Sequence, residues 1–413
     1  MTSVSDIDES VDVLVIGGGP AGLSLATEAS KNLGASVLVA ERATYFGGTP
    51  QSTHHQGFGV RDLHRIVDGP SYARQLERRA IVNGVDLRSG TNVSGWSPQL
   101  VANLSGHGRN YSVQTRALFL ATGVYERSRH SRLVAGDRGA GIYTTGSLQR
   151  LVYQLGLKIG TRAVIVGAEH VSFSAVQTLA ESGCDTVALI TNHENHQTFA
   201  PLRWLVASRR HVPIITNDAI NFIHGKHRVT GVTLNSGKYL ACDTVIFSGD
   251  WMPENSLARI HELEICDVSR APAVDIFGRT RQPGVFAIGN LSHPAEAADL
   301  CAVHARRSEI GLRSWLEAGF WPHDVVSVRA SAPIISTWPS LISSQHTTGK
   351  MLLRVDRFVN PPATITVKQG DRTIWSYNHR RTIVTNRSIT IPMHWAREIN
   401  PDQGDVEVNV IGG

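Results

Sequence analysis

The chain has 413 residues, of which 41% are hydrophobic and 18% are charged, and its formal net charge is +5. This length exceeds what one hydrophobic core usually organises, so we expect two or three domains. The sequence has no block of basic residues typical of a nucleic-acid interface and no apolar run long enough to span a membrane. Its N-terminus lacks the features of a signal peptide. We therefore expect a cytoplasmic protein that binds neither nucleic acid nor membrane.

The four cysteines are widely spaced and include no Cys-x-x-Cys pair. They are Cys184, Cys242, Cys266 and Cys301. This spacing argues against a disulfide scaffold and against a compact zinc or iron–sulfur site. We expect no metal site.

The first predicted element is an apolar strand over residues 11–16, which runs into Gly17-x-Gly19-x-x-Gly22. A helical pattern follows, and a second apolar strand over 37–40 ends at Glu41. In such a βαβ unit the first glycine allows a tight turn, the second lets a pyrophosphate approach the backbone, and the third lets the helix pack closely. The acid can accept a hydrogen bond from a ribose hydroxyl. The pattern predicts a dinucleotide-binding unit.

A second βαβ pattern begins with a strand over 163–166, a turn at Gly167, a helix over 171–182 and a strand over 187–190. Here Glu169 stands where the second glycine would be, and Ser172 replaces the third. A carboxylate at this point repels a pyrophosphate, so we do not expect tight NAD(P)H binding. The alternatives are a structural relic, or a different ligand for Glu169 and His170.

The remaining elements complete the outline of the fold. An apolar strand over 117–120 ends in Ala-Thr122-Gly123, strands follow over 244–248 and 284–290, and a helix is predicted over 294–318. Alternating runs over 351–355, 364–368, 373–376, 388–391 and 406–410, with a hairpin turn at 369–371, predict a small β domain. Its tryptophans (Trp338, Trp375, Trp395) fill its core or form a subunit contact.

We therefore predict an α/β fold with two Rossmann-like dinucleotide-binding domains and a small C-terminal all-β domain. The expected boundaries are 10–125 with 272–322 for the first domain, 126–271 for the second, and 323–413 for the β domain.

The glycine fingerprint, the Ala-Thr-Gly segment and the late Gly-Asn segment together resemble the two-dinucleotide-binding-domain flavoproteins, such as glutathione reductase and thioredoxin reductase. The resemblance covers residues 10–320 and implies that the first unit binds FAD. Asn290 replaces the aspartate usual in that family, and its amide can still accept a hydrogen bond. The implied FAD contacts are Gly17, Gly19, Pro20, Ala21, Gly22, Glu41, Arg42, Gly48, Thr49, Val93, Thr122, Gly123, Gly289 and Asn290.

The stretch from Ala121 to Gln149 resembles the linker in the FAD subunit of hydrogen cyanide synthase and of related amino-acid and opine dehydrogenases. Those subunits often carry a C-terminal cysteine-rich iron–sulfur segment. This sequence has no cysteine after Cys301, so the resemblance does not extend to that cluster.

The disulfide reductases of the wider family carry a Gly-Gly-Thr-Cys…Cys run beside the flavin. Here Pro50 and His55 stand at the two cysteine positions, which excludes the dithiol mechanism. We expect His55, or as second choice His54, to accept a substrate proton as a hydride leaves for the flavin. The alternative is a structural histidine.

Two arginines follow this segment closely. Arg61 or Arg65 could hold a substrate carboxylate in bidentate fashion, and the alternative is an ordinary ion pair between an arginine and an aspartate.

The sequence thus predicts an FAD-dependent dehydrogenase or oxidase, cytoplasmic and oligomeric, that takes a hydride from a small amine, amino acid or hydroxy compound. It would act alone or with a partner flavoprotein subunit. One alternative is an NAD(P)H-dependent flavoprotein reductase without a redox disulfide. Another is an FAD-bearing structural or regulatory subunit of a partner dehydrogenase.

Overall fold

The computed structural model describes residues 7–199, 203–204, 210–346 and 348–412. These residues form two compact units. The first takes in the described parts of Met1–Gln51, Gly57–Val124 and Pro253–Gly413, and the second takes in Ser52–Gln56 and the described parts of Tyr125–Met252. No helix within the described residues combines the length and the apolar character that a membrane crossing requires.

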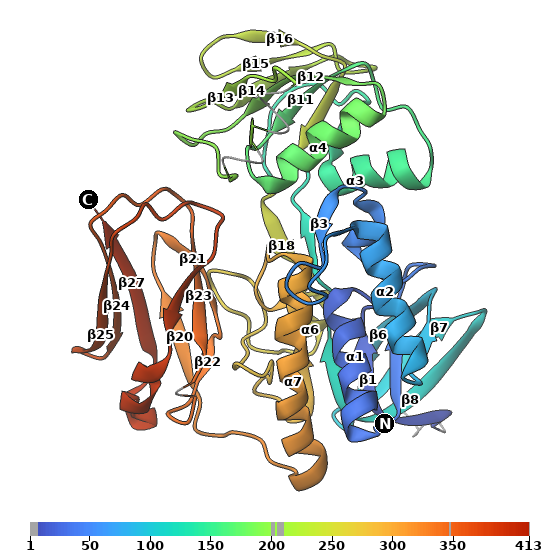
Figure 1. The fold of residues 1–413 in the computed structure, drawn as a ribbon, viewed down its shortest axis with the longest axis vertical. Coiled ribbons are helices and arrows are strands. Elements are labelled where there is room, and N and C mark those ends of the chain that lie inside the picture. Colours follow the sequence, from blue (N-terminus) through green and yellow to red (C-terminus); the bar gives the residue numbers. More distant parts are fainter. Residues whose placement is uncertain (1–6, 200–202, 205–209, 347, 413) are drawn as a thin grey trace. The chain divides into compact units, whose positions relative to one another are not determined.

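The first unit is built on a mostly parallel sheet with the strand order β5-β2-β1-β8-β7-β6, and β19 pairs with β8. Helix α1 packs against both α2 and α7 (Figure 1). The strands are β1 (Glu9–Ile16), β2 (Val37–Ala40), β5 (Asp86–Arg88), β6 (Thr91–Trp96), β7 (Val101–Gly106), β8 (Arg109–Leu120) and β19 (Val285–Ala287). The helices are α1 (Pro20–Leu33), α2 (Gly69–Val82) and α7 (Ala298–Ala318).

Local sequence explains why these elements form where they do. The second half of β1, from Val13 to Ile16, is buried, as expected for a strand with parallel neighbours on both sides. Helix α1 begins at Pro20, whose missing N–H would have no partner in the first turn. It ends at Gly34, which adopts the left-handed conformation (φ 61°) that a helix C-terminus commonly requires.

The chain after α7 forms sheets with the orders β22-β20-β27-β24-β25 and β21-β23-β26. Their hydrophobic core contains Trp338 and Trp395 and is continuous with residues of the first sheet, such as Leu14 and Leu38. Trp375 is partly buried against the same core. The structure thus favours the core role for these tryptophans. The strands are β20 (Val326–Ala330), β21 (Ile334–Trp338), β22 (Leu341–Ile342), β23 (Lys350–Val355), β24 (Ala363–Gln369), β25 (Arg372–His379), β26 (Ile389–Pro392) and β27 (Val406–Gly412).

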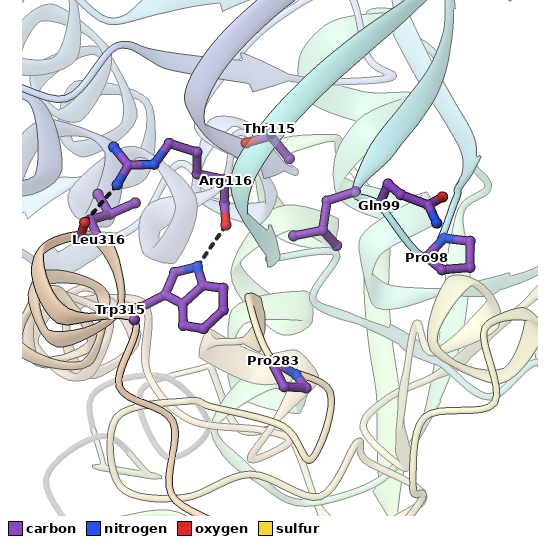
Figure 2. Close-up of a pocket in the computed structure, with 9 residues that line it drawn as sticks. Pro98, Gln99, Thr115, Arg116, Pro283, Trp315 and Leu316 are labelled. Atoms are coloured by element: carbon purple, nitrogen blue, oxygen red, sulfur yellow. Dashed lines mark hydrogen bonds between the residues drawn. The ribbon is translucent and has the colours of Figure 1, made fainter. Parts of the chain in front are cut away.

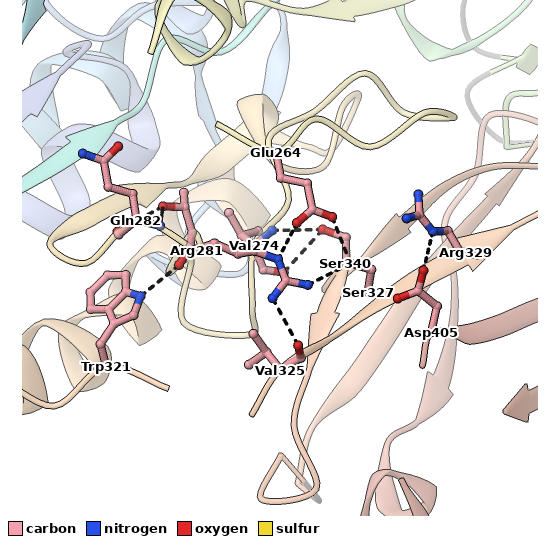
Figure 3. Close-up of polar contacts among 11 residues, drawn as sticks. Glu264, Val274, Arg281, Gln282, Trp321, Val325, Ser327, Arg329, Ser340 and Asp405 are labelled. Atoms are coloured by element: carbon pink, nitrogen blue, oxygen red, sulfur yellow. Dashed lines mark hydrogen bonds and ion pairs between the residues drawn. The ribbon is translucent and has the colours of Figure 1, made fainter. Parts of the chain in front are cut away.

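Polar contacts also hold the β-rich region to the rest of the first unit (Figure 3). Arg281 pairs with Glu264, and it donates to the Val325 carbonyl at 3.2 Å and to Ser327 Oγ at 3.0 Å. The Trp321 indole N–H donates to the Thr280 carbonyl at 3.0 Å. The β-rich region and the first sheet therefore belong to one compact body.

The second unit has a parallel sheet with the order β10-β17-β11-β12-β13 and a separate antiparallel sheet, β14-β15-β16. Its helices include α3 (Thr145–Gln149) and α4 (His170–Glu181). The strands are β10 (Ile142–Thr144), β11 (Arg162–Val166), β12 (Asp185–Ile190), β13 (Ile214–Ile215), β14 (Ile220–His224), β15 (Gly231–Leu234), β16 (Tyr239–Ala241) and β17 (Thr244–Phe247). Shorter elements of the chain are β3 (Gln56–Phe58), β4 (Val67–Asp68), β9 (Val124–Glu126), β18 (Trp251–Pro253) and α6 (Ser256–Ile260).

The predicted fold class is confirmed: the fold has two Rossmann-like domains and a C-terminal β-rich region. The hairpin predicted at 369–371 is also confirmed, because β24 and β25 pair antiparallel across Gly370. The last helix begins at Ala298 and not at residue 294, and the strands between residues 326 and 342 were not anticipated. The domain boundaries drawn from the sequence stay a prediction.

Candidate functional site

The turn that follows β1 requires glycine at two of its positions. Gly17 has φ 113°, and a Cβ atom there would lie 2.4 Å from the Ala121 carbonyl oxygen. A Cβ atom at Gly22 would lie 2.0 Å from the Gly17 carbonyl oxygen. These contacts let the turn sit on the end of β8 and let α1 pack closely on β1, as the spacing of the glycines predicts.

Gly19 differs from the other two glycines because the space beside it is open. It is the N-cap of α1, and no described atom lies within 4 Å of the position a Cβ would take. Pro20 follows as the first helical residue, and Ala21 is buried. The first turn of a helix presents unpaired N–H groups and the positive end of the helix dipole. Open space at this point fits a pyrophosphate.

Glu41 lies at the end of β2, beside this turn. Its Oε2 accepts the backbone N–H of Gly18 at 2.8 Å, and its Oε1 accepts that of Ala43 at 2.8 Å. A carboxylate offers about four lone-pair sites, so it can still accept a ribose hydroxyl. The neighbouring Arg42 is exposed.

The Gly47-Gly48-Thr49 segment packs on the same turn. The Gly47 N–H donates to the Gly18 carbonyl at 2.8 Å, and a Cβ atom at Gly48 would lie 3.1 Å from the Cα atom of Gly19. Thr49 begins a short 3₁₀ turn, Thr49–Ser52. The structure thus brings Gly48 and Thr49 next to the glycine turn, as expected.

Three further predicted contacts, Val93, Thr122 and Gly123, lie elsewhere in the first unit. The Thr122 hydroxyl donates to the Glu254 carbonyl at 2.7 Å, and the Gly123 carbonyl accepts the Glu254 N–H at 2.9 Å. Val93 is buried on β6, the strand whose first residue, Thr91, donates its N–H to the Glu41 carbonyl at 2.9 Å. The contact of Thr91 ties the start of β6 to Glu41, and the contacts of Thr122, Gly123 and Val93 with FAD stay predictions.

Gly289 and Asn290 complete this side of the site. Gly289 has φ 67°, and a Cβ atom there would lie 2.6 Å from the Cβ atom of Ala21, so the loop rests on α1. The Asn290 amide bonds to the backbone of Glu296 at both ends: Oδ1 accepts the N–H at 2.8 Å and Nδ2 donates to the carbonyl at 3.1 Å. This side chain closes its own loop and keeps one lone-pair site and one N–H for a ligand.

Sequence reasoning missed the ion pair that fixes this loop. Arg354, from β23, pairs with Glu296 at 2.7 Å, and the two side chains are only 8% and 7% exposed. Arg354 also donates to the carbonyls of Pro294 and Ala295. The C-terminal β-rich region therefore shapes the loop that carries Asn290.

Two histidines that follow Asn290 in the chain were also missed: His293 is buried and His304 is partly buried. His293 and His304 approach at 3.3 Å between Nε2 and Nδ1, and both rings pack against Trp338. Burial lowers the pKa of His304 to about 4 and holds the pKa of His293 well below its usual range. Both rings are neutral at pH 7. In the sequence, only the closeness of His293 to Asn290 indicated that this histidine lies near the site.

The predicted catalytic histidines belong to the second unit. The His54 ring stacks on Tyr153 with centroids 4.0 Å apart, and His55 Nδ1 lies 2.8 Å from the Gln56 carbonyl oxygen. Their segment is held by Gln149, which accepts from the Thr53 hydroxyl at 3.2 Å, among other contacts. The structure thus brings the two histidines together, and their catalytic role stays a prediction.

Arg61 pairs with Asp299 at 3.2 Å between Nη1 and Oδ1, and its backbone N–H bonds to the same carboxylate at 3.0 Å. This favours the ion-pair interpretation over a substrate clamp. Its sequence neighbour Asp62 instead accepts the Tyr72 hydroxyl at 2.7 Å. Arg65 is exposed.

A pocket of about 560 Å³ lies in the first unit, away from these residues. Figure 2 shows Trp315 donating to the Arg116 carbonyl at 2.7 Å and Arg116 donating to the Leu316 carbonyl at 2.6 Å within it. The pocket reaches the middle of β8 at Thr115 and Arg116, whereas Thr122 follows the end of that strand. It contains none of the predicted site residues.

The fold is of the thioredoxin-reductase type. A family model described as pyridine nucleotide-disulphide oxidoreductase matches residues 11–307. The chain belongs to this family, whose members typically bind FAD.

Comparisons with known proteins agree with this assignment. The chain is 25% identical over 360 residues to an opine oxidase subunit from Agrobacterium tumefaciens (strain Ach5), covering 75% of this chain and 70% of that protein. It is 26% identical over 198 residues to the alpha subunit of sarcosine oxidase from Corynebacterium sp. (strain U-96), covering 45% of this chain and 20% of that one. Thioredoxin reductase from T. acidophilum has a similar fold, with a TM-score of 0.61 and 20% identity over 74% of this chain and 98% of its own.

Proposed function

We propose that the chain is an FAD-dependent oxidoreductase that takes a hydride from a small amine, amino acid or hydroxy compound, and that it works as one subunit of a heteromeric complex. The observation that carries this proposal is the open cradle at Gly19, where the N-terminus of α1 meets the carboxylate of Glu41. Amine substrates are supported by the names of the two relatives, which are subunits of an opine oxidase and of a sarcosine oxidase.

The residues present fit FAD. The turn from Gly17 to Gly22 would hold the pyrophosphate, and Glu41 would accept a ribose hydroxyl. When bound, FAD supplies a ring system that accepts two electrons as a hydride. The loop of Asn290, fixed by Arg354, would orient the remaining part of the cofactor.

The proton that leaves the substrate nitrogen or oxygen needs an acceptor. We assign this role to His55, with His54 as the second choice, because histidine is the most frequent general base in enzymes. The family's dithiol route is closed to this chain, since Pro50 and His55 replace the two cysteines. A small organic substrate therefore replaces a disulfide as the reaction partner.

A partner flavoprotein subunit is the natural electron acceptor in this scheme. Both relatives are named as subunits of oxidases, and the resemblance of the 121–149 stretch to the FAD subunit of hydrogen cyanide synthase points the same way. The match spans about a fifth of the sarcosine oxidase subunit.

The test is anaerobic mixing of the purified, FAD-loaded protein with sarcosine, with an N-carboxyalkyl amino acid as an opine probe, and with NADH. We expect one of the amines to remove the visible flavin absorbance, and NADH to leave it unchanged. Rapid reduction by NADH and by no amine would instead support a flavoprotein reductase. If none of these compounds reduces the flavin until a partner protein is added, the result would support an FAD-bearing structural subunit.

A further inference from the structure

The two Rossmann-like units have a similar turn between the first strand and the helix, but the residue at the helix N-cap differs. Gly167, which follows β11, has φ 130°, close to the 113° of Gly17 in the first unit. Two residues after this glycine, Glu169 is the N-cap of α4, whereas Gly19 is the N-cap of α1. The N-terminus of the helix thus faces open space at Gly19 in the first unit, whereas in the second unit the Glu169 side chain lies at this point.

The Glu169 carboxylate uses the N–H groups that an anion would need. It accepts the backbone N–H of Ser172, and Ser172 Oγ accepts the Glu169 N–H at 3.3 Å, so the two residues form a capping box. A Cβ atom at Gly249 would lie 1.5 Å from Glu169 Oε1. The carboxylate therefore packs against the Gly249 backbone, where a bound phosphate would approach the chain.

A second carboxylate fills the other side of this cradle. Glu126 Oε2 accepts the N–H of Gly146, at the start of α3, at 2.7 Å, and its Oε1 accepts the N–H of Gly249 at 3.2 Å. The nearby cation is also engaged, because Arg132 donates to the Gly249 carbonyl at 2.6 Å and lies 3.7 Å from Asp250. The N–H groups of Ser172, Gly146 and Gly249 are thus paired with carboxylates within the chain.

The ribose position is changed as well. Thr191 follows β12 where Glu41 follows β2 in the first unit. Thr191 is buried, and its hydroxyl oxygen accepts the N–H of His193 and the amide of Gln197, each at 3.3 Å. A ribose therefore meets no carboxylate at this position.

We propose that the second unit does not bind NAD(P)H, because Glu126 and Glu169 bond to backbone N–H groups around the turn after β11 that a pyrophosphate would need. A dinucleotide would have to displace two carboxylates from their hydrogen bonds and bring further negative charge beside them. This member of the pyridine nucleotide-disulphide family thus keeps the flavin cradle but has neither the redox cysteines nor a working nucleotide cradle. The proposal concerns the second unit alone and does not depend on the proposed substrate.

The test is calorimetric titration of the full chain with NADH and with NADPH. We expect no saturation by either nucleotide up to about 1 mM. In the double variant Glu126→Ala/Glu169→Gly, which removes both carboxylates and leaves the Gly146 and Gly249 N–H groups free for a ligand, we expect NADH to bind at least about tenfold more tightly than to the wild type.

Glu181→Gln serves as the control, because it removes a carboxylate at the other end of α4 and leaves the cradle intact. This variant should bind nucleotide as poorly as the wild type. Circular dichroism and thermal unfolding would verify that each variant is folded. Saturation of the wild type below about 0.1 mM NADH, or a folded double variant with no gain in affinity, would overturn the proposal.

Discussion

Glu41 accepts the backbone N–H of Gly18 at 2.8 Å, and this bond ties the glycine turn to the end of β2. The other carboxylate oxygen accepts the N–H of Ala43 at the same distance. Glu41 therefore shapes the cradle before any ligand enters it, in addition to the ribose contact that we assign to it.

Replacing Glu41 by glutamine should weaken both roles. The amide has one oxygen where the carboxylate has two, so an NH₂ group would face one of the two backbone N–H groups. We expect the free energy of unfolding to fall by about 1–3 kcal/mol, and the FAD content per chain to fall with it. Urea unfolding and the flavin absorbance of purified protein measure the two effects. Glu317→Gln, an exposed carboxylate on α7, is the matched control; equal behaviour of the two variants would contradict the assignment.

The ion pair between Arg354 and Glu296 makes a separate prediction about stability. Both side chains are buried, so Arg354→Met leaves the Glu296 carboxylate without its counter-charge. We expect a loss of about 3–5 kcal/mol in the free energy of unfolding. The double variant Arg354→Met/Glu296→Met should cost less than the single one, because no unpaired charge remains. Denaturant unfolding of both variants measures these free energies. If the free energy of unfolding of Arg354→Met lies within about 1 kcal/mol of the wild-type value, the prediction is wrong.

The stability of the protein should depend on the ionisation of Glu169. Burial raises the pKa of Glu169 to about 7, and the charges of Glu126 and Asp250 act in the same direction. The charge of Arg132 acts in the opposite direction and lowers this pKa. Because the folded-state pKa lies above the unfolded value, the folded state binds the extra proton. Stability from this group is complete below about pH 4.5 and is lost as the pH rises through about 7.

We therefore expect the wild type to lose stability between about pH 5 and pH 8, and Glu169→Gln to lose less over the same range. Urea unfolding at each pH provides the comparison. A wild-type curve parallel to that of the variant would show that Glu169 ionises as an ordinary surface acid.

His55→Ala tests the proton acceptor. We expect the rate of flavin reduction by the organic substrate to fall by about 100-fold, the usual contribution of a general base, with unchanged FAD content. His54→Ala is measured beside it, because His54 is the second choice for this role and stacks on Tyr153; a larger fall in His54→Ala would move the role to His54. Stopped-flow absorbance gives the rate of flavin reduction for both variants. An unchanged rate in His55→Ala would show that His55 has a structural role and is not the proton acceptor.

Local patterns were sufficient for the elements that form the cradle. The apolar run of β1, the turn with its obligatory glycines at Gly17 and Gly22, and the acid after β2 are encoded within a short stretch, and the structure assembles them as the pattern predicts. The replacement of a glycine by Glu169 is equally visible in the sequence, and its consequence for nucleotide binding stays a prediction.

The interactions that escaped sequence reasoning join residues far apart in the chain. Glu126 meets Gly249, and Arg354 meets Glu296, and no periodicity connects either pair. The start of α7 was misplaced for a related reason: the Asn290 side chain binds the backbone of Glu296 and holds that stretch out of the helix. Tertiary contacts decided these features, and a single sequence contains no signal for them.

The most direct test of the account is the FAD content of Gly19→Glu compared with Gly22→Ala. A Cβ atom at Gly19 meets open space, whereas one at Gly22 would lie 2.0 Å from the Gly17 carbonyl oxygen. Gly19→Glu should therefore unfold at the same denaturant concentration as FAD-free wild type and yet be colourless, while Gly22→Ala should lose stability itself. A folded Gly19→Glu protein that retains one FAD per chain would contradict the central claim that the pyrophosphate lies in this cradle.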